Sequence, residues 1–587
     1  MNRKKIHYIL LTLVTIAATI WGYFSYITYV PSQQVNDQRI VILPKQLEHQ
    51  TKKIIAKPRV VQVTKNVFVA LSYDLANVIL IRTTAGNVIV DTASCPERAR
   101  QIKKALKEHM MEKTAAVIYT HSHVDHMGGA SVWIDKGTQV WATKAFAEHL
   151  FKQYGLFTPT ERQRGWRQFG RHVAQKDLPI SAIGKRLDLE AVLENGTRIP
   201  SHTFSNKQIL QIGSQEIHLV EAHGETHDQL FVWLPKQKIL MPGDNYYHAF
   251  PNLYTIRGTQ PRPVDEWIQS LDKMRSYDPQ YLVPSHTHPV IGKENIRKSL
   301  RDYRDAIQWI RDEVVRRANR GESLAKMTEE IALPSHLAQA ENLQELYGQI
   351  DWSVRAIYTN ELGWFDGNSD QLYPLAKNES AKREIDLMGG AKKVIATAKK
   401  ARTTGEIKWA IHLLAKLRDS GLQNHTVNSE LSLCYKDLAK KVFNTNGRAY
   451  LLERAHELAQ GKSALPLSKL DDTLIAQVPL KVIFTIMCSK LIPEKSINVH
   501  ETVEFHMEDT KEKFIITVRN GIAELVLEKS LPDTPKPIAI VRTDSMTWKK
   551  LALNKQQAAS AITSGKLSIE GKVAFLKFLK KFNRNQG

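Results

Sequence analysis

The ten residues Thr120–Gly129 read THSHVDHMGG and carry the clearest chemical signal in this chain. His121 and His123 are two positions apart, so in an extended segment or tight loop their imidazoles project the same way and can bind one metal ion. Asp125 and His126 can bind a second. Imidazole and carboxylate ligands suit zinc or a similar cation, and two such ions about 3.5–4 Å apart are typical of hydrolytic sites. The run therefore predicts hydrolysis by a metal-activated water.

The flanking residues predict how this run is positioned. Upstream, Ala115–Thr120 (AAVIYT) is a short apolar, partly β-branched run typical of a buried strand that ends at the histidines. Downstream, Gly128 and Gly129 permit a sharp turn. The alternative, four unrelated polar residues in a surface loop, fits poorly because the order H-x-H-x-D-H with a following Gly-Gly is specific. We therefore expect a metal site in a loop that follows a strand.

Two metal ions need more ligands than one loop provides, so residues at later strand ends are expected to complete the site. Asp244 follows the strand-like run Lys238–Leu240, and His286 follows Gln280–Val283. Glu225, in AHGETH, comes just after a third such run. Three nearby histidines are rival ligands: His223, His227 and His288.

With 587 residues the chain is too long for one hydrophobic core, which predicts three or four domains. Its 82 Lys and Arg against 60 Asp and Glu give a net charge of +22. This charge favours anionic partners, which are nucleic acid, an anionic membrane surface or small anionic substrates. No zinc-knuckle or RNA-recognition signature supports nucleic acid, so we expect none. Three scattered cysteines exclude both a disulfide framework and a thiolate metal site: Cys95, Cys434 and Cys488.

The N-terminus predicts a membrane segment. Arg3, Lys4 and Lys5 precede an uncharged, mostly apolar run, Tyr8–Val30. The run exceeds the ~20 residues that span a bilayer and the ~7–15 of a signal-peptide core, and no clear A-x-A site follows. An uncleaved anchor is therefore favoured over a cleaved signal that would give a secreted protein, and a buried globular helix ranks third. By the positive-inside rule the bulk of the chain lies outside the cytoplasm, which is the periplasm if the source is a Gram-negative bacterium.

The rest of the chain changes pattern twice. Residues 31–57 are polar without clear periodicity and are predicted to be a linker or arm. A part with short β-rich runs and one helical pattern follows: Val60–Val69, Asn77–Arg82, Asn87–Val90 and the helical Arg98–Lys113. From about Tyr303 to Val442 the spacing is helical, with more apolar surface than a small helical layer can bury, which predicts a homodimer. From Pro466 onward strand patterns return, with Asn520-Gly521 as a hairpin turn.

The site motifs together resemble a known family. H-x-H-x-D-H, then Gly-Asp at Asp244, then the late His286, each after a strand, resembles the metallo-β-lactamase superfamily. Most of that superfamily has G-H-[ST] where this chain reads GET at Glu225, and the glutamate is similar to the alkyl sulfatase branch, which acts on detergent-like sulfate esters. Asp244 is a departure, because that branch commonly has Glu there. Three further stretches resemble the same branch: YDLANVILI (73–81), NLYTIRG (252–258) and VRAIYTNELGWFDGN (354–368).

The resemblance implies a fold class and, with the N-terminal patterns, a set of domains. The fold class is an α/β catalytic part, the αββα metallo-β-lactamase sandwich, followed by an all-α helical dimerisation domain and a C-terminal α+β domain similar to sterol-carrier proteins. The expected units are a membrane anchor or signal (1–30), a linker or arm (31–57), the catalytic domain (58–302), the helical domain (303–445) and the C-terminal domain (466–587).

The resemblance also implies roles for individual residues. It implies two zinc ions, and it assigns His121, His123 and Glu225 to one, Asp125, His126 and His286 to the other, and Asp244 as the bridge. Asp125 and Asp244 are also expected to be catalytic. The sulfate-recognition stretch is matched at four positions: Asn252, Tyr254, Thr255 and Arg257.

Residue chemistry agrees with an oxyanion site at Arg257. A tetrahedral oxyanion suits a planar guanidinium with hydroxyl and amide donors, whereas a surface salt bridge is the alternative. Because Arg257 is expected to be neither a ligand nor a core residue, its replacement should leave the melting temperature nearly unchanged. Asp91, which ends NVIVDT, is expected to orient a metal ligand. His248 stays open between a general acid and a turn histidine.

The sequence therefore predicts a membrane-anchored, extracytoplasmic, homodimeric zinc hydrolase that cleaves an amphiphilic sulfate ester. Two alternatives remain. One is another hydrolase of the same fold, acting on a lactone, thioester or phosphodiester. The other is a membrane-anchored lipid-binding protein with a vestigial metal site.

Overall fold

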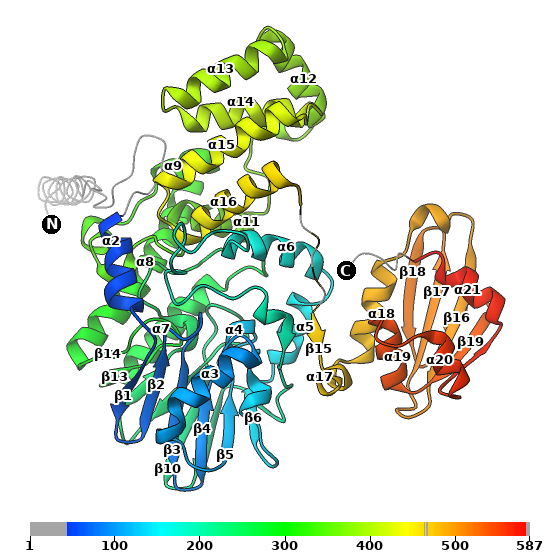
Figure 1. The fold of residues 1–587 in the computed structure, drawn as a ribbon, viewed down its shortest axis with the longest axis horizontal. Helices are drawn as coiled ribbons and strands as arrows, with labels where there is room; N and C mark the ends of the chain where they lie inside the picture. The colour runs from blue at the N-terminus through cyan, green and yellow to red at the C-terminus, as the bar shows by residue number, and fades with distance from the viewer. Residues whose placement is uncertain (1–43, 463, 465, 467, 583–587) are drawn as a thin grey trace, which may run out of the picture.

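The computed structural model describes residues 44–462, 464, 466 and 468–582. The predicted membrane segment, Tyr8–Val30, lies outside them, and none of the helices they form is both long and apolar enough to cross a bilayer. Figure 1 shows a β-sandwich with helices outside it, a helical arm that projects from one end, and a C-terminal unit to one side.

Two sheets pack face to face to form the sandwich. The first has the order β1-β2-β3-β4-β5-β6-β8, formed by Arg59–Thr64, Val67–Leu71, Val78–Thr83, Gly86–Val90, Thr114–Ile118, Gln139–Thr143 and His202–Phe204. The second has the order β14-β13-β12-β11-β10-β9, formed by Val290–Ile291, Tyr281–Leu282, Ile239–Met241, Leu230–Leu234, Gln215–Glu221 and Lys207–Ile212. Strands β2, β4 and β11 are buried along their whole length, because both faces of their sheets are covered.

Helices cover the outer face of each sheet. One apolar core lies between the two sheets. The first sheet packs outward against α3 (Pro96–Leu106) and α5 (Phe146–Gln153). The second packs outward against α7 (Val264–Ser276) and α8 (Lys293–Ala318). This arrangement confirms the αββα sandwich that the resemblance implies.

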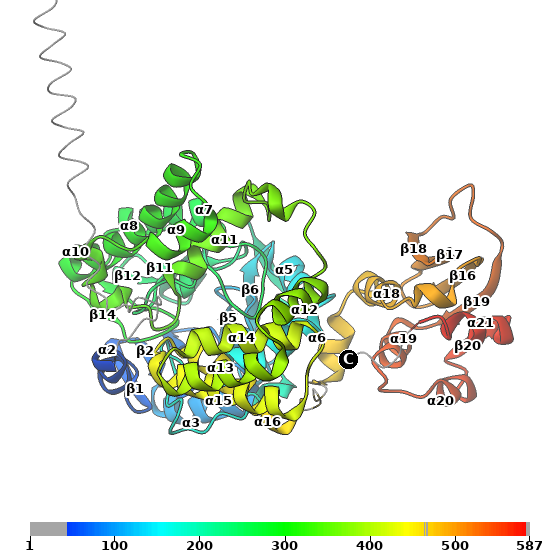
Figure 2. The same cartoon turned by 90° about the horizontal axis from the view of Figure 1, so that it is seen from above.

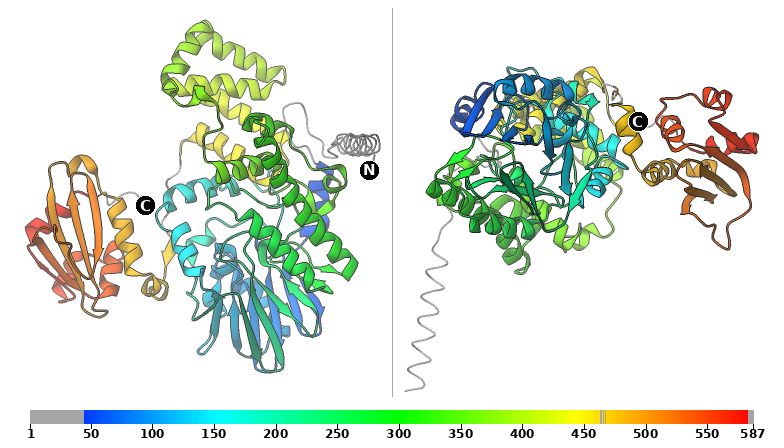
Figure 3. Two further views of the ribbon diagram at one scale, coloured as in Figure 1. Left: turned by 180° about the vertical axis from the view of Figure 1, so that it is seen from behind. Right: turned by 90° about the horizontal axis from the view of Figure 1, so that it is seen from below.

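The helices after the sandwich divide between two cores. One group packs with α8 on the second sheet: α9 (Leu324–Glu330), α10 (Ser335–Ala338) and α11 (Ile350–Leu362). A second group has its own core and forms the helical arm (Figure 3, left): α12 (Lys377–Leu387), α13 (Ala391–Thr403), α14 (Ile407–Asp419) and α15 (His425–Lys441). Helix α16 (Thr445–Gln460) then returns to pack against α6 (Thr158–Phe169) of the sandwich.

The C-terminal unit is a five-stranded sheet in the order β18-β17-β16-β19-β20 with helices packed on one face. Its elements are α17 (Asp472–Gln477), α18 (Leu480–Ser489), β16 (His500–Met507), β17 (Lys513–Arg519), β18 (Ile522–Leu527), β19 (Pro537–Thr543), α19 (Ser545–Ala552), α20 (Ala558–Thr563), β20 (Leu567–Glu570) and α21 (Lys572–Leu579). Asn520 and Gly521 both have positive φ and join β17 to β18, which confirms the predicted hairpin turn. Figure 2 shows that the unit stands beside the sandwich. Just before α17, β15 (Lys469–Leu470) pairs in parallel with β7 (Glu194–Asn195) of the sandwich.

The structure adds detail to two local predictions. The β-rich run Val60–Val69 forms parts of two strands, β1 and β2, which are joined by a turn at which Thr64 pairs with Val67. The described end of the expected linker is helical, with α2 at Pro44–His49 and a π-helix at Gln50–Ile55. Gln50 is buried there, and its amide donates to two backbone carbonyls of the sandwich at 2.7 Å. This segment is too short for its apolar residues to show a period, so the sequence did not predict its packing.

Candidate metal centre

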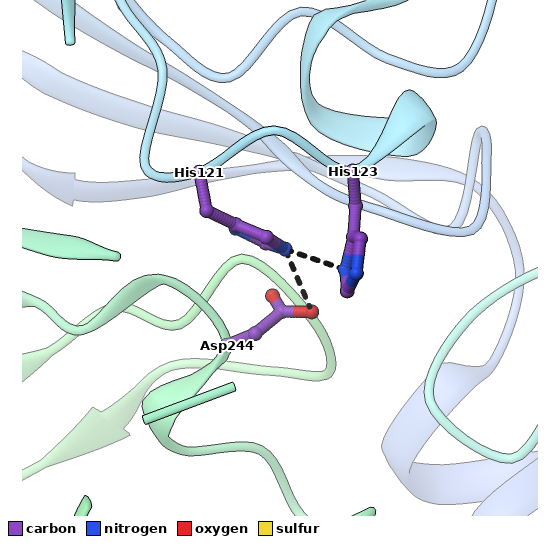
Figure 4. Close-up of side chains that lie close together, drawn as sticks. All are labelled: His121, His123 and Asp244. Atoms are coloured by element: carbon purple, nitrogen blue, oxygen red, sulfur yellow. Dashed lines mark hydrogen bonds and ion pairs between the residues drawn. The ribbon is translucent and has the colours of Figure 1, made fainter. Parts of the chain in front are cut away.

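His121 and His123 come from one loop and Asp244 from another, and the three side chains point toward one another (Figure 4). Strand β5 ends just before His121, and the short turn after β12 carries Asp244. His121 Nε2 lies 2.8 Å from His123 Nδ1 and 3.8 Å from Asp244 Oδ2. All three side chains are buried, and their facing atoms can surround one ion.

Asp125, His126 and His286 form a second buried group next to the first. Helix α4 (Val124–Met127) presents Asp125 and His126, and His286 follows β13. Asp125 Oδ2 lies 3.4 Å from His126 Nε2 and 3.5 Å from His286 Nε2. The structure thus brings together six of the seven expected ligands in two groups of three.

Asp244 lies between the two groups. Its Oδ2 is 3.1 Å from His286 Nε2, and its Oδ1 is 3.4 Å from His126 Nε2. The preceding Gly243 has φ +60°, and a Cβ there would lie 2.1 Å from Gln229 Nε2, so the turn that presents Asp244 requires glycine. This is the position that a bridging ligand needs.

Asp91 accepts hydrogen bonds from three residues around the site. Its Oδ2 accepts hydrogen bonds from His126 Nδ1 at 2.8 Å and from the Ser285 hydroxyl at 2.6 Å, and its Oδ1 accepts from the Thr120 amide at 2.9 Å. A carboxylate on the far nitrogen of a histidine fixes the ring and leaves the other nitrogen for a metal. The sequence predicts that Asp91 orients a metal ligand, and the structure gives His126 as the candidate ligand that it contacts.

Electrostatics separate the histidines of the two groups. Burial, with the positive charge of neighbouring groups, holds the pKa values of His121 and His123 well below the usual range, which favours neutral imidazoles able to bind a metal. Burial also opposes charge on His126, yet the combined charge of Asp244, Asp125 and Asp91 raises its pKa well above the usual range. The carboxylates therefore stabilise positive charge at this point, either as protons or as a divalent cation.

The residues present fit a pair of borderline cations. Within the described chain, His126 Nε2 and Asp244 Oδ1 are buried and make no hydrogen bond, although each faces the space between the two groups. Imidazole with carboxylate is the donor set that zinc prefers, and no thiolate is present in either group. The geometry supports a binuclear metal site.

Glu225, the seventh expected ligand, borders the first group without joining it. Its Oε1 is 4.0 Å from His123 Nδ1 and only 2.7 Å from a guanidinium nitrogen of Arg262. Burial raises the pKa of Glu225 to about 7, against the opposing effect of Arg262. Sequence reasoning missed Arg262, which is 5 % exposed; its only signal is a second arginine five positions after Arg257.

Arg257 lies beside the first group but is not a surface residue. Its Nη2 is 3.2 Å from His123 Nε2, its Nη1 donates to Thr255 Oγ1 at 2.9 Å, and its Nε donates to Glu161 Oε1 at 3.0 Å. The side chains of Arg257 and Glu161 are 11 % and 13 % exposed. The premise that Arg257 is not a core residue is therefore wrong, and we expect its replacement to lower stability, because a buried carboxylate would lose its partner.

The other residues of the expected sulfate-recognition stretch are placed differently. Thr255 Oγ1 donates to Gln168 Oε1 at 3.0 Å, and the backbone amide of Arg257 donates to the same oxygen at 2.9 Å. The side-chain amide of Asn252 is buried and makes no hydrogen bond in the described chain, and Tyr254 is 36 % exposed. Neither of these two lines the cavity beside the metal groups. Thr255 and Gln168 instead hold the backbone that carries Arg257.

The rival histidines lie away from both metal groups. His223 contacts Glu221 at 3.2 Å, and the ring of His227 stacks on His149. The rings of His248 and His288 lie 5.2 Å apart, and burial lowers the pKa of His248 to about 3. A neutral histidine that contacts neither metal group favours the turn-histidine reading of His248 over the general acid.

A cavity of about 790 Å³ opens from the two metal groups. Its polar end contains Arg257 and Glu161. Apolar side chains line the rest, contributed by α5, α6 and the C-terminal helix α18: Leu150, Phe151, Trp166, Phe169, Val482, Ile483 and Ile486. Helix α18 is apolar on two faces, because Leu480 and Phe484 point into its own domain's core while Val482 and Ile486 face the cavity.

Comparison with known families agrees with this architecture. Models of three families match successive parts of the chain: the metallo-beta-lactamase superfamily (73–286), alkyl sulfatase dimerisation (323–461) and alkyl sulfatase C-terminal (468–585). The chain belongs to the metallo-β-lactamase superfamily, in its alkyl sulfatase branch.

Similar proteins extend over most of the chain. A linear primary-alkylsulfatase from Pseudomonas sp. (strain ATCC 19151) is 28% identical over 76% of this chain and 88% of its own length. An (R)-specific secondary-alkylsulfatase from Pseudomonas sp. is 26% identical over 85% of this chain and 76% of its own. The solved structure of a stereoselective inverting sec-alkylsulfatase from Pseudomonas sp. is similar in fold, with a TM-score of 0.79, 23% identity and coverage of 95% of this chain and 92% of that one.

Proposed function

We propose that this protein is a binuclear zinc hydrolase that cleaves alkyl sulfate esters to an alcohol and sulfate. The observation that carries the proposal is a buried double ligand group, joined at Asp244, that opens into a cavity with a guanidinium at one end and apolar walls beyond it. Such a cavity matches an amphiphile with an anionic head and a hydrocarbon chain.

The ligand assignment follows the two groups. His121 and His123, with Glu225, would hold one zinc ion, and Asp125, His126 and His286 would hold the other, with Asp244 between them. Glu225 Oε2 is buried without a hydrogen bond in the described chain, so it retains a lone pair for a ligand role. The shorter Asp244 sits within 3.8 Å of a histidine nitrogen of each group, which supports bridging despite the Glu that is common in this branch.

The chemistry divides between the cations and the protein. Bound zinc ions supply Lewis-acid charge and lower the pKa of water toward ~7. Arg257 would bind the sulfate and stabilise the charge that develops on it as the ester bond breaks. With His123 Nδ1 turned toward the metal position, its Nε2 would carry the ring proton, so Arg257 Nη2 would lose that acceptor and be available to the sulfate oxygens.

The apolar part of the cavity would bind the hydrocarbon chain. Aromatic residues of α6 form one wall and aliphatic residues of α18 the opposite one, so the substrate would lie between the sandwich and the C-terminal unit. The curated relatives with this architecture are named alkylsulfatases for primary and for secondary esters, so their names support the ester class without selecting a chain length or branching pattern.

Two further expectations remain part of the proposal. A homodimer is supported by the match to the alkyl sulfatase dimerisation model and by large exposed apolar residues at the start of the arm: Leu362, Trp364, Leu372, Tyr373 and Leu387. Anchoring through Tyr8–Val30, with the rest of the chain extracytoplasmic, rests on the sequence.

Metal analysis followed by a sulfate-release assay tests the proposal. The purified protein should contain about two zinc ions per chain and release sulfate from primary or secondary alkyl sulfates, with activity lost on chelation and restored by zinc. Activity on lactones, thioesters or phosphodiesters with none on sulfates would select another hydrolase of this fold. A metal-free protein that binds lipids and retains its cellular role would select the lipid-binding alternative.

A further inference from the structure

Glu161 is a buried carboxylate at the polar end of the cavity. The anionic head of a substrate would be expected to meet positive charge there. It lies in the first turn of α6, and its Oε1 accepts from Arg257 Nε at 3.0 Å. Its side chain is 13 % exposed, and the residue lines the cavity together with Arg257 and the ligand carboxylates Asp125 and Asp244. A carboxylate in this position faces whatever anion Arg257 binds.

The two buried guanidiniums near the metal groups are both paired in this way. Arg257 contacts Glu161, and Arg262 contacts Glu225 at 2.7 Å. The formal charges of these four side chains sum to zero. Arg162, the next residue along α6, donates to Pro466 O and the Ser468 hydroxyl of the segment that leads to the C-terminal unit, so its bonds point away from Arg257. These four side chains therefore offer a ligand no net positive charge beyond that of the bound metal ions.

We propose that Glu161 is a specificity-determining residue that shifts the preference of this site away from doubly charged phosphate monoesters and toward singly charged sulfate esters. The inference rests on the proposed function and names the charge that its substrate must carry. A sulfate ester has one negative charge at neutral pH. A phosphate monoester has a second ionisation near pH ~6 and carries about 1.5 to 2 charges at pH 7. The two heads have the same tetrahedral shape, and Arg257 alone would favour the head with the larger negative charge.

The geometry indicates the size of the discrimination. Arg257 separates Glu161 from a bound head group by about one guanidinium, so the head lies roughly 6 Å from the carboxylate. At that separation and an effective dielectric constant near 20, each additional negative charge on the head weakens binding by roughly tenfold to a hundredfold. Arg257 and the metal ions attract the second charge, and Glu161 offsets part of that attraction.

Replacing Glu161 by glutamine tests this role directly. The probes are decyl sulfonate and decyl phosphate, which have the same chain and differ in charge, with affinities measured calorimetrically on the zinc-loaded, full-length protein. The wild type sets the reference ratio of the two affinities. In Glu161→Gln the ratio of the two affinities should shift toward the phosphate by roughly tenfold or more. A purely structural role for Glu161 would weaken both probes equally and leave the ratio unchanged.

Two control variants bracket the charge effect. Glu161→Asp keeps the charge and should keep the wild-type ratio of the two affinities. Glu148→Gln removes one exposed carboxylate from the neighbouring α5 and should leave both affinities unchanged. Zinc content and melting temperature identify any variant that fails to fold.

The possible failures are distinguishable. A ratio in folded Glu161→Gln within about twofold of the wild-type ratio, while the wild type hydrolyses decyl sulfate, would overturn this inference and leave the proposed function intact. If Glu161→Gln does not fold, Glu161→Ala replaces it, and a ratio there within about twofold of the wild-type ratio would also overturn the inference. Absence of sulfate release by the zinc-loaded wild type would instead count against the proposed function.

Discussion

The metal centre and the start of the helical arm differ in the kind of side chain that they bury and the kind that they expose. At the centre, charged residues are buried and face one another: Asp91, Asp125, Asp244, Arg257 and Arg262 are all nearly inaccessible. At the start of the arm, large apolar residues face solvent, with Trp364 69 % and Tyr373 95 % exposed. Buried charge is costly unless partners or a ligand balance it, and exposed apolar surface is unfavourable unless something covers it.

The comparison separates two kinds of incomplete structure. The centre has the atoms of a binding site arranged around a common space, so a small cation completes it. The arm has a well-formed core of its own, from α12 to α15, but its lead-in segment has no cover within the described chain. A macromolecular surface, which we propose to be a second copy, completes that region.

Removing a ligand from the centre should have the largest effect. His121→Ala should lose the first zinc ion and lower kcat by more than the roughly 10–100-fold typical of changes behind a ligand. Elemental analysis of the purified variant and a sulfate-release assay measure both. Full activity with intact zinc content would mean that the THSHVDHMGG run is not the metal site.

Removing Arg257 should have the next largest effect and should act on two properties. Arg257→Ala is expected to cost about 2–5 kcal/mol of transition-state binding, which is roughly thirty-fold to several-thousand-fold in kcat/KM. Because Glu161 loses its partner, the free energy of unfolding should also fall, by about 3–5 kcal/mol if Glu161 remains charged.

Chemical denaturation and kinetics separate these two effects of Arg257. Arg257→Lys should recover stability better than activity, because an ammonium pairs with Glu161 but does not match a tetrahedral anion at two points. Hydrolysis of sulfates at the wild-type rate would exclude Arg257 from the substrate site.

A change on α18 should alter chain-length preference rather than chemistry. Ile486→Asp places a charge in the apolar wall and should lower kcat/KM for dodecyl sulfate by roughly ten- to thirty-fold, since each buried methylene contributes about 0.8 kcal/mol. Hexyl sulfate should be nearly unaffected. Thr485→Asp on the same helix does not line the cavity and is the matched control. Equal losses on both esters would show that α18 matters for folding and not for the chain.

The arm should give the smallest effect on activity and a clear effect on assembly. Tyr373→Asp should weaken the proposed dimer by about 2 kcal/mol, roughly thirty-fold in Kd, while kcat changes less than about twofold. Light scattering across a dilution series measures the shift. Ile497→Asp, at a 62 % exposed residue of the C-terminal unit, is the control. A wild type that is already monomeric at micromolar concentration would remove the dimer from the proposal.

Local sequence patterns predicted much of the metal site and parts of the fold. The spacing of His121, His123, Asp125 and His126 indicated two metal groups because a strand followed by one helical turn determines where such close neighbours point. Asp244 and His286 were found because each directly follows a strand-like run. The Asn520-Gly521 turn was predicted because both residues tolerate positive φ.

Only the tertiary structure decided which helices form the arm. The apolar stripes of α8, α9 and α11 look like those of α12–α15 in the sequence, yet the first set covers the second sheet and the second set packs on itself. An apolar stripe predicts that a helix face is buried but does not identify what buries it.

The sequence by itself determined the donor types and their local directions, and with them the metal-dependent chemistry. It did not determine the electrostatic balance around them. Glu161 meets Arg257 across 96 residues, and the pairing of Arg262 with Glu225 likewise depends on how two loops approach each other. Backbone geometry over a few residues is encoded locally, whereas the pairing of buried charges depends on the packing of distant segments, because burial itself makes those pairs necessary.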